Sequence, residues 1–339
     1  MRMSWTTTTR PTCMMPMPST EASTTGAGVR LIAPAKINLA LEVLHKRPDG
    51  YHEIDTVMST LDLADRVSVT ERAAGAGLKV TLTGAYAAGI EPEDDLAGRA
   101  GRLLAEEMGR APDLHIAIEK RIPSPAGLGG GSSDAAAVLR ALNALWSLDL
   151  DPERLAAIGA KIGSDVPFFL TGGTARCTGR GDRVEVLRDM RPLRMLILVP
   201  PLPPGEAKTA RRYAALTPHD FSHGHVAQRL AHRIARNAPP PTNDLVNAFE
   251  RVIERTQPEL VAHYAAYGAA GAPRLHLCGA GPAVFLLVTE GAKIAELRRD
   301  FGATGATVIE AHTLPRAAAL KIERIAAPVS APATESEPA

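Results

Sequence analysis

The sequence predicts an α+β protein with two domains, and three observations support this prediction. The chain has 339 residues, which is enough for two ordinary domains and a sizeable buried core. Short runs in which apolar and polar residues alternate, as in strands, are interspersed with segments whose apolar residues recur at helical spacing. A turn-rich stretch over residues 172–181 precedes an apolar run at residues 195–199, which places the domain boundary near residue 190.

Composition and charge exclude several classes of protein. Lys and Arg number 38 against 37 for Asp and Glu, a formal net charge of +1, so no strong overall field attracts nucleic acid or a membrane. Three scattered cysteines, Cys13, Cys177 and Cys278, form no Cys-x-x-Cys pair, which argues against a disulfide framework and a zinc site. We therefore expect a cytoplasmic protein, monomeric or homodimeric, with no nucleic-acid or membrane partner.

The two ends of the chain differ from the rest in composition. Residues 1–28 are rich in Thr, Ser, Met and Pro and lack the apolar core of about 7–15 residues that a signal peptide has. We expect a disordered extension here, and residues 326–339, rich in Pro, Ala and Glu, predict a disordered tail. The domains then cover residues 29–190 and 191–325.

The first predicted strands carry polar residues on one face. From Lys36, apolar residues alternate with polar ones, so Lys36 and Asn38 share the face opposite the apolar set. A turn at Pro48-Asp49-Gly50 is followed by Tyr51 and His52 and then by a strand over residues 54–58. By themselves, a lysine at a strand start is usually solvated, and such aromatic and imidazole side chains more often pack than bind. The next predicted elements are strands at residues 66–70, 78–83 and 114–119 and a helix at residues 95–109.

A glycine-rich stretch over residues 123–136 follows, with the sequence Pro-Ser-Pro-Ala-Gly-Leu-Gly-Gly-Gly-Ser-Ser-Asp-Ala-Ala. Its four glycines carry no Cβ atoms, so backbone N–H groups can approach a bulky anion closely. Ser132, Ser133 and Asp134 predict a helix start, and apolar residues recur at helical spacing behind them. The free N–H groups and the positive end of the helix dipole together indicate a phosphate site.

This stretch has three alternative interpretations. A Walker P-loop requires a Lys before the Ser or Thr that follows the last glycine, whereas Gly131 stands directly before Ser132. A dinucleotide fingerprint requires a third glycine where Ser132 stands, and no acidic strand end follows at the expected distance. A glycine-rich capped turn without a ligand remains open for the stretch alone, although so much glycine costs conformational entropy that an ordinary turn avoids.

The second half offers weaker signals. Asp151-Pro152 and Gly163 mark the start and stop of a helix, which places Asp165 in a loop, where an aspartate is most often a turn residue. A short helix is predicted to carry Thr209 and Tyr213, and a helix is expected over residues 292–301. Between two strands lies Leu-Cys-Gly-Ala-Gly-Pro-Ala at residues 277–283. The sequence shows no recognisable His-Asp pair that would activate Cys278 as a nucleophile, so we interpret this cysteine as a small core residue.

The glycine stretch resembles the central phosphate-binding motif of the GHMP kinases, which include galactokinase and the homoserine, mevalonate and phosphomevalonate kinases. The resemblance runs from about residue 30 to about residue 324 and is closest to the kinases of the non-mevalonate isoprenoid pathway. It implies a two-domain architecture of mixed sheets packed with helices and an active site in the cleft between the domains. It also implies ATP-dependent phosphorylation of the 2-hydroxyl, a tertiary hydroxyl, of a substrate bearing a cytidine diphosphate group.

The resemblance also implies roles for particular residues. Asp165 accepts the proton of the substrate hydroxyl, and Lys36 orients the substrate and stabilises charge. ATP and Mg²⁺ are the implied cofactors, and the metal ligands stay unassigned. The implied ATP-binding residues are Pro123, Ser124, Pro125, Ala126, Gly127, Leu128, Gly129, Gly130, Gly131, Ser132 and Ser133.

The same resemblance implies a binding site for the cytidine base. Tyr51 stacks on cytosine and His52 bonds to its edge, while Asn38, Thr209 and Tyr213 complete the substrate site and Tyr213 forms a second aromatic wall. Cys278 and Ala283 stand where the family usually has small hydroxyl residues. Two alternatives remain open: another GHMP kinase of the mevalonate or homoserine type, which Tyr51-His52 discriminates against, and a nucleotide-binding module without catalysis.

Overall fold

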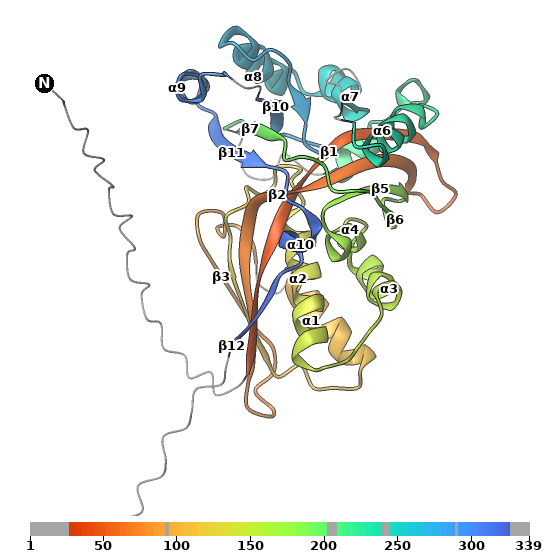
Figure 1. Cartoon of the computed structure of the whole chain (residues 1–339), viewed down its shortest axis with the longest axis vertical. Coiled ribbons are helices and arrows are strands. Elements are labelled where there is room, and N and C mark those ends of the chain that lie inside the picture. The colour runs from red at the N-terminus through yellow and green to blue at the C-terminus, as the bar shows by residue number, and fades with distance from the viewer. Residues whose placement is uncertain are drawn as a thin grey trace, which may run out of the picture.

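The structure, a computed structural model, describes residues 27–91, 95–201, 209–238, 240, 245–288 and 291–325. The extension and the tail expected from composition fall outside these residues, except that Ala27 is described and Gly28 already belongs to the first strand. The described chain folds into helices packed on two β-sheets (Figure 1). This confirms the predicted α+β class.

The larger sheet is built around two long antiparallel strands, β1 and β2, which run from the lower half of the molecule into its upper half (Figure 1). Its order is β12-β1-β2-β4-β3, with β5 on β2, β6 on β5, and β8 parallel to β1. Three register shifts interrupt the β1–β2 ladder, and such bulges bend strands and re-aim side chains. The strands are β1 (Gly28–Lys46), β2 (His52–Glu71), β3 (Lys79–Thr83), β4 (Leu114–Glu119), β5 (Thr174–Gly179), β6 (Arg183–Val186), β8 (Val246–Asn247) and β12 (Ile322–Ile325).

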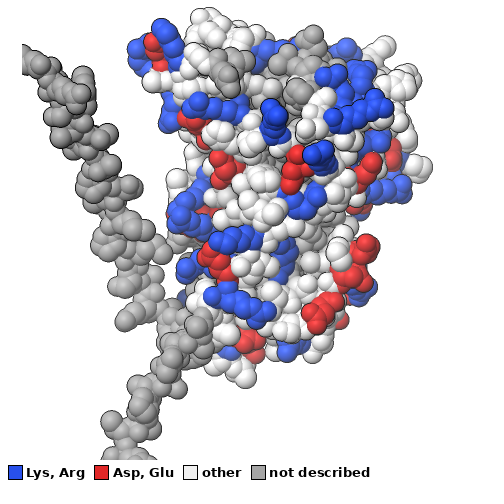
Figure 2. All heavy atoms as spheres, in the orientation of Figure 1, with Lys and Arg blue, Asp and Glu red and all other residues white. Residues whose placement is uncertain are grey.

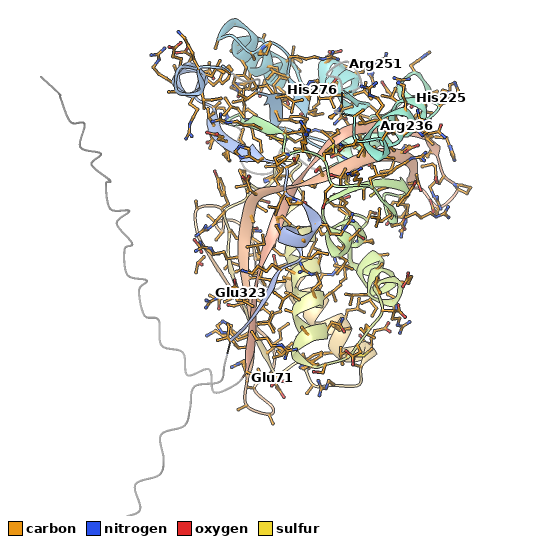
Figure 3. All side chains as sticks on the ribbon, viewed as in Figure 1. Glu71, His225, Arg236, Arg251, His276 and Glu323 are labelled. Carbon is orange, nitrogen blue, oxygen red and sulfur yellow. The ribbon has the colours of Figure 1, made fainter. Side chains whose placement is uncertain are left out.

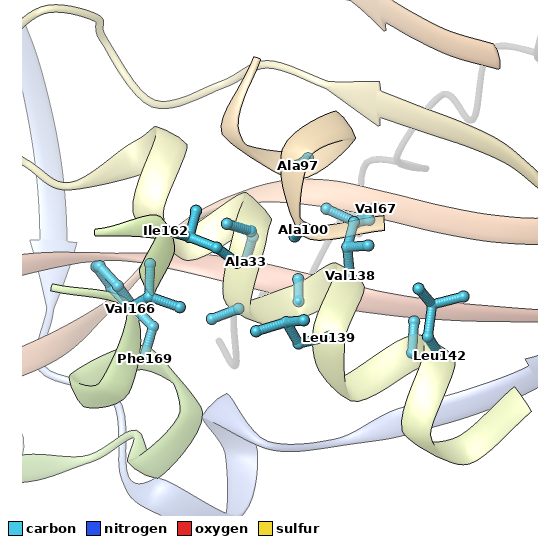
Figure 4. Close-up of a cluster of buried hydrophobic side chains, with 14 of the residues drawn as sticks. Ala33, Val67, Ala97, Ala100, Val138, Leu139, Leu142, Ile162, Val166 and Phe169 are labelled. Atoms are coloured by element: carbon cyan, nitrogen blue, oxygen red, sulfur yellow. The ribbon is translucent and has the colours of Figure 1, made fainter. Parts of the chain in front are cut away.

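Helix α2 packs directly on β1 and β2, and three further helices surround it. Its buried face presents Val138, Leu139 and Leu142 to Ala33 and Val67 of the sheet (Figure 4). Small residues on α1 and α2 allow the close approach of these two helices, which bury a continuous apolar core. The helices of this layer are α1 (Leu96–Glu107), α2 (Gly130–Leu145), α3 (Pro152–Ile162) and α4 (Val166–Thr171).

The smaller sheet has the order β11-β7-β10-β9 and lies in the upper half of the molecule with α7, α8 and α9 (Figure 1). Its central strands are almost wholly apolar and buried, as expected for strands covered on both faces. Its strands are β7 (Arg194–Val199), β9 (His276–Leu277), β10 (Val284–Leu287) and β11 (Thr307–His312). The remaining helices are α5 (Thr209–Ala214), η1 (Pro218–Asp220), α6 (His225–Ala235), α7 (Phe249–Thr256), α8 (Pro258–Ala269), α9 (Ile294–Ala303) and α10 (Arg316–Ala319).

Two strands of the larger sheet come from the sequence beyond residue 190, where the domain boundary was predicted. Strands β8 and β12 follow that point in the sequence, yet both pair with β1. Glu323 of β12 accordingly lies beside the large sheet, in the same half as Glu71 at the end of β2, whereas His276 of β9 lies in the other half (Figure 3). The larger sheet is therefore assembled from both parts of the sequence.

The starts of helices α2 and α4 differ from the sequence prediction. Helix α2 begins at Gly130, not at Ser132, because Gly129 adopts a left-handed conformation, φ 77°, and serves as the N-cap. Asp134 is therefore inside the helix and caps nothing. Residues 166 and 167 were expected in a loop but form the first turn of α4, with Pro167 where a missing N–H is tolerated and Asp165 at the N-cap.

Surface charge agrees with a neutral protein. On the face shown, acidic and basic side chains are interspersed, with basic ones gathered at the upper right where α6 and α7 lie (Figure 2). Among the described residues, no helix has both the length and the apolar run that crossing a membrane requires.

Candidate active site

A cavity of about 920 Å³ gathers segments that are far apart in the sequence. Strands β1 and β2, the glycine stretch before α2, the start of α4, helix α5 and the turn at residues 279–281 all contribute to its lining. The predicted site residues on this lining are Lys36, Asn38, Tyr51, His52, Asp165, Thr209, Tyr213 and residues 123–132. Ser133 alone among the predicted residues lies behind the wall, buried inside α2.

Lys36 and Asp165 form a pair at the centre of this lining. The Lys36 ammonium lies 3.7 Å from the Asp165 carboxylate and donates to the Asn38 amide oxygen at 2.7 Å. The lysine side chain is only 5% exposed, whereas the aspartate side chain is 35% exposed. A buried cation therefore lies beside a carboxylate that solvent and ligands can reach. This arrangement is suited to proton acceptance by the carboxylate and charge stabilisation by the cation.

The amide of Asn38 is oriented by a residue that sequence reasoning missed. Asn38 Nδ2 donates to Thr56 Oγ1 at 2.8 Å, and Thr56 Oγ1 donates to the Ala40 carbonyl at 2.6 Å. This chain fixes which amide atom faces Lys36, since the oxygen must accept from the lysine. Thr56 lies on β2 opposite Leu41 of β1, and only the strand register reveals that neighbourhood.

The glycine stretch is fixed to β1 by the hydrogen bond from Lys36 N to the Leu128 carbonyl, 2.9 Å. Glycine is sterically required at two of its positions. A Cβ on Gly127, φ 81°, would lie 1.9 Å from the Cys278 carbonyl oxygen, and one on Gly129 would lie 2.8 Å from the Phe169 ring. The glycines therefore permit close backbone packing as well as access for an anion.

A buried ion cluster lies under the start of α2. Lys120 contacts both Asp65 and Asp134, and all three are essentially inaccessible to solvent. Burial raises the pKa of Asp134 well above its usual range although the lysine charge opposes this shift. Burial also opposes the charge of Lys120, but the two carboxylates outweigh it and raise the lysine pKa. The cluster explains why Asp134 is inside the helix: its carboxylate binds Lys120 instead of capping.

A second part of the lining is aromatic. The His52 ring is buried, with its centre 5.4 Å from that of Tyr213, and Tyr213 in turn packs edge-on against Phe249. Burial, followed by the nearby Lys46 charge, lowers the pKa of His52, so the imidazole is neutral at pH 7 and offers one donor and one acceptor.

Tyr51 differs from its neighbour because its side chain is exposed, at 52%. The Arg180 guanidinium lies over the Tyr51 ring at 4.8 Å and is held there by Asp182 at 2.9 Å. Arg180 also lines the cavity. The sequence predicted turns over residues 172–181, which include Arg180, but did not assign this arginine to the site, because no local pattern connects it with Tyr51.

The turn at residues 279–281 closes the cavity beside the glycine stretch. The two glycine segments interlock through the hydrogen bond from Ala283 N to the Ala126 carbonyl, 3.2 Å, and Asn247 Nδ2 supports the Gly279 carbonyl at 2.7 Å. Cys278 and Ala283 are fully buried. Burial raises the pKa of the Cys278 thiol to about 12, which confirms a core residue and excludes a thiolate nucleophile at neutral pH.

Comparison with known proteins identifies this arrangement. Residues 95–173 match the family model described as GHMP kinases N terminal domain. A 4-diphosphocytidyl-2-C-methyl-D-erythritol kinase from Dehalococcoides mccartyi (strain BAV1) is 39% identical over 260 residues, covering 77% of this chain and 89% of the relative. One from Bacillus licheniformis is 41% identical over 265 residues, covering 78% and 90%. A crystal structure of 4-(cytidine 5'-diphospho)-2C-methyl-D-erythritol kinase superposes with a TM-score of 0.66 at 34% identity, covering 84% of this chain and 99% of that one.

The fold and the glycine-lined cavity are therefore those of a GHMP kinase, a phosphotransferase with an alcohol as acceptor. Because relatives at about 40% identity align along most of their own length, the family can be given more narrowly. The chain belongs to the 4-diphosphocytidyl-2-C-methyl-D-erythritol kinase family.

Proposed function

We propose that the protein transfers a phosphoryl group from ATP to the 2-hydroxyl of 4-diphosphocytidyl-2-C-methyl-D-erythritol, in the non-mevalonate route to isoprenoid precursors. The observation that carries this proposal is the joining of two different surfaces in one cavity. The glycine stretch and the ring cluster of His52 and Tyr213 both line the cavity that holds the Lys36–Asp165 pair. Lys36 packs against the position of Gly129, and Asp165 lies near Gly181, which follows Arg180.

Phosphoryl transfer requires positioning and charge stabilisation more than covalent chemistry. In our proposal Asp165 accepts the proton of the attacking hydroxyl, for which its exposure to the cavity is suitable. Lys36, held by Asn38, stabilises the negative charge that develops around the transferring group. The backbone N–H groups before and within the first turn of α2 bind the ATP phosphates, supported by the helix dipole.

Mg²⁺ is the second cofactor that we propose, and the donor set of the cavity fits it. Asp165 is the one acidic side chain on the lining formed by the described residues, and no group of three or more His, Cys, Asp or Glu residues suitable for a metal occurs in that part of the chain. A magnesium ion bound with nucleotide typically takes one or two carboxylates and otherwise phosphate oxygens and water. When bound, it supplies positive charge to the phosphates; Asp165 and Ser132 are the candidate protein ligands.

The ring cluster would select the cytidine base. The neutral His52 imidazole can both donate to and accept from the edge of cytosine. Tyr51 and Tyr213 offer stacking surfaces, and Thr209 lines the same end of the cavity. Neither mevalonate nor homoserine carries a base, so a kinase for either compound has no use for this cluster.

The proposal also covers the location, the oligomeric state and the domain division of the protein. The protein acts in the cytoplasm as a monomer or a homodimer. Its chain divides into an N-terminal domain over residues 29–190 and a C-terminal domain over residues 191–325, with the smaller sheet, whose four strands all follow residue 190, as the main support for this division. The interlocked glycine segments at residues 126–129 and 278–283 then form one contact between the domains, beside the pairing of β8 and β12 with β1.

A coupled ADP-release assay with ATP, Mg²⁺ and a panel of alcohols tests the proposal. We expect turnover with the cytidine-bearing substrate and none above background with mevalonate or homoserine. Turnover with mevalonate or homoserine instead would support a different GHMP kinase, and nucleotide binding without turnover on any alcohol would support a non-catalytic module.

A further inference from the structure

Arg212 of helix α5 is buried, with 2% exposure, yet it lacks the usual partners of a buried arginine. Its Nη1 donates to the Ala280 carbonyl, its Nη2 donates to Gln257 Oε1 at 2.9 Å, and its Nε has no partner among the residues that the structure describes. Both partners are neutral. No carboxylate in the described part of the chain pairs with this guanidinium.

Such a charge is expensive to bury. An ionised group moved from water into a protein interior costs several kcal/mol unless an opposite charge or full hydrogen bonding compensates it. Burial accordingly lowers the pKa of Arg212, opposed only by nearby Tyr264. Elsewhere in the same region Arg255 is paired with Asp220 at 2.9 Å, so the pairing of Arg212 with neutral groups alone, within the described residues, is a local feature.

The guanidinium lies one layer of backbone behind the cavity wall. Ala280, which accepts its hydrogen bond, and Gly281 both line the cavity, and Nη1 lies 3.4 Å from where a Cβ on Gly281 would be. The other end of the turn touches the reacting centre, since a Cβ on Gly279 would lie 2.8 Å from Lys36 Nζ. The turn therefore connects the buried charge to the residues that we propose for catalysis.

We propose, on the basis of the function proposed above, that Arg212 is a positioning residue for phosphoryl transfer. It holds the turn at residues 279–281 through the Ala280 carbonyl, and its positive charge behind the wall favours the anionic phosphates that enter the cavity. The compensating negative charge is then supplied by the ligands rather than by a side chain. Water is excluded at this depth, so the charge is screened much less than one at the surface.

Three substitutions separate the two parts of this role. Arg212→Met removes both the charge and the hydrogen bond, Arg212→Gln keeps a donor without the charge, and Arg212→Lys keeps the charge. Misplacing a wall of the site costs up to about 10²-fold in rate, so we expect Arg212→Met to lower kcat by about tenfold to 10²-fold and to raise the Kd for ATP. Activity should follow the order Arg, Lys, Gln, Met.

Arg140 provides a matched control. It is another buried arginine that donates only to backbone carbonyls, those of Ala319 and Leu320, and burial lowers its pKa to about 10. It lies on α2 eleven positions after Gly129 and does not line the cavity. Arg140→Met should lower the melting temperature about as much as Arg212→Met, because both remove a buried guanidinium, while leaving kcat and the KM for ATP within about twofold of wild type.

All variants should be assayed below their own melting temperatures. A kcat of Arg212→Met within about twofold of wild type, or an equal loss of activity in Arg140→Met, would overturn the positioning role. Arg212→Gln as active as Arg212→Lys would overturn the role of the charge. Titration with ATP alone distinguishes a failure here from a failure of the proposed function, because nucleotide binding to Arg212→Met and wild type is measured without any acceptor alcohol.

Discussion

Two regions of the cavity differ in what forms them. They are the glycine stretch at residues 123–132, called the glycine end, and the cluster of Tyr51, His52 and Tyr213, called the aromatic end. The glycine end consists of backbone: at Gly127 and Gly129 no side chain fits, because a Cβ would meet the Cys278 carbonyl or the Phe169 ring. The aromatic end consists of side chains, with His52 held against Tyr213 and Tyr51 covered by Arg180. A backbone cradle suits phosphate, which every nucleotide carries, whereas side-chain edges suit the recognition of one particular base.

This difference teaches where each kind of specificity comes from. Residue identity at the glycine end is imposed by steric space, so substitutions there should disturb the loop itself and with it ATP binding. Residue identity at the aromatic end is imposed by the chemistry of the ligand, so substitutions there should affect the acceptor alone. Lys36, which packs against Gly129, forms with Asp165 the pair that serves the reaction between the two ligands.

The largest effect should come from the residue between the two ends. Asp165→Asn removes the proposed proton acceptor while keeping size and hydrogen bonding, and we expect kcat to fall by at least about 10²-fold. Equilibrium titrations should show that ATP and the acceptor still bind. An equal loss of ATP affinity would leave Asp165 only its candidate role as a ligand of the nucleotide-bound Mg²⁺ and would contradict its role as proton acceptor.

Gly127→Ala should be nearly as damaging to ATP binding. The new methyl would lie 1.9 Å from the Cys278 carbonyl oxygen at φ 81°, so the loop must shift away from the turn at residues 279–281. We expect the Kd for ATP, measured by titration, to rise by about tenfold or more, since a misplaced anion cradle loses backbone hydrogen bonds worth about 1.5–3 kcal/mol each to a charged group.

Gly268→Ala is the control for that substitution. Gly268 lies in α8, where an added Cβ meets nothing within 4 Å, and alanine favours a helix. Its ATP affinity should equal that of wild type. An unchanged ATP titration in folded Gly127→Ala would contradict a backbone-built phosphate end.

His52→Ala should affect only the acceptor. Loss of a buried hydrogen-bond partner costs about 1–3 kcal/mol, so we expect the KM for the cytidine substrate to rise by about 5- to 150-fold, while the KM for ATP stays the same. His232→Ala, an exposed histidine of α6 outside the cavity lining, serves as the control. A parallel rise in both KM values would mean that the two ends are not separate.

The last effect is one of pH on stability and does not involve the ligands. Burial, with the Arg274 charge, lowers the pKa of His276 in β9 from 6.5 to about 4, and this residue lies in the upper half of the molecule among the elements of the smaller sheet (Figure 3). Between those two pKa values the unfolded chain binds a proton at this histidine and the folded chain does not, so the free energy of unfolding falls as the pH drops from 6.5 to about 4. Above pH 6.5 the contribution of His276 to stability is fully present.

His276→Phe should flatten that dependence by at most about 3 kcal/mol, measured as the free energy of unfolding in urea across this pH range. The variant also helps to interpret the aromatic end. If binding of the cytidine substrate still weakens at acidic pH in His276→Phe, the cause is protonation of His52 and not unfolding at His276. An unchanged pH slope in His276→Phe would remove His276 as the source.

The backbone end of the cavity was largely predictable from sequence because its physics is local. Consecutive glycines ahead of a helical pattern indicated an anion site before any tertiary contact was known, although the helix start was placed two residues late because Asp134 binds Lys120. The strand at residues 114–119 that leads to the loop was predicted at its observed bounds.

The aromatic end was not predictable in the same way. Tyr51 and His52 were proposed as ligands only through the family resemblance, and their neighbours Arg180 and Phe221 were missed because contacts between distant segments leave no local pattern. Thr56 and Arg212 were missed for the same reason: one acts through the register of β1 and β2, the other through a turn far along the chain. Side-chain sites require tertiary structure, whereas backbone sites are visible in composition.

The most direct test of the central claim is the ratio of kcat/KM for the cytidine substrate to that for its uridine analogue, in wild type and in His52→Ala. A site built to bond a base edge rejects the wrong base only while its partner is present. We predict that wild type prefers cytidine strongly and that most of this preference disappears in His52→Ala, with ATP binding unchanged. An identical ratio in both proteins would contradict the assignment of the aromatic end to base recognition.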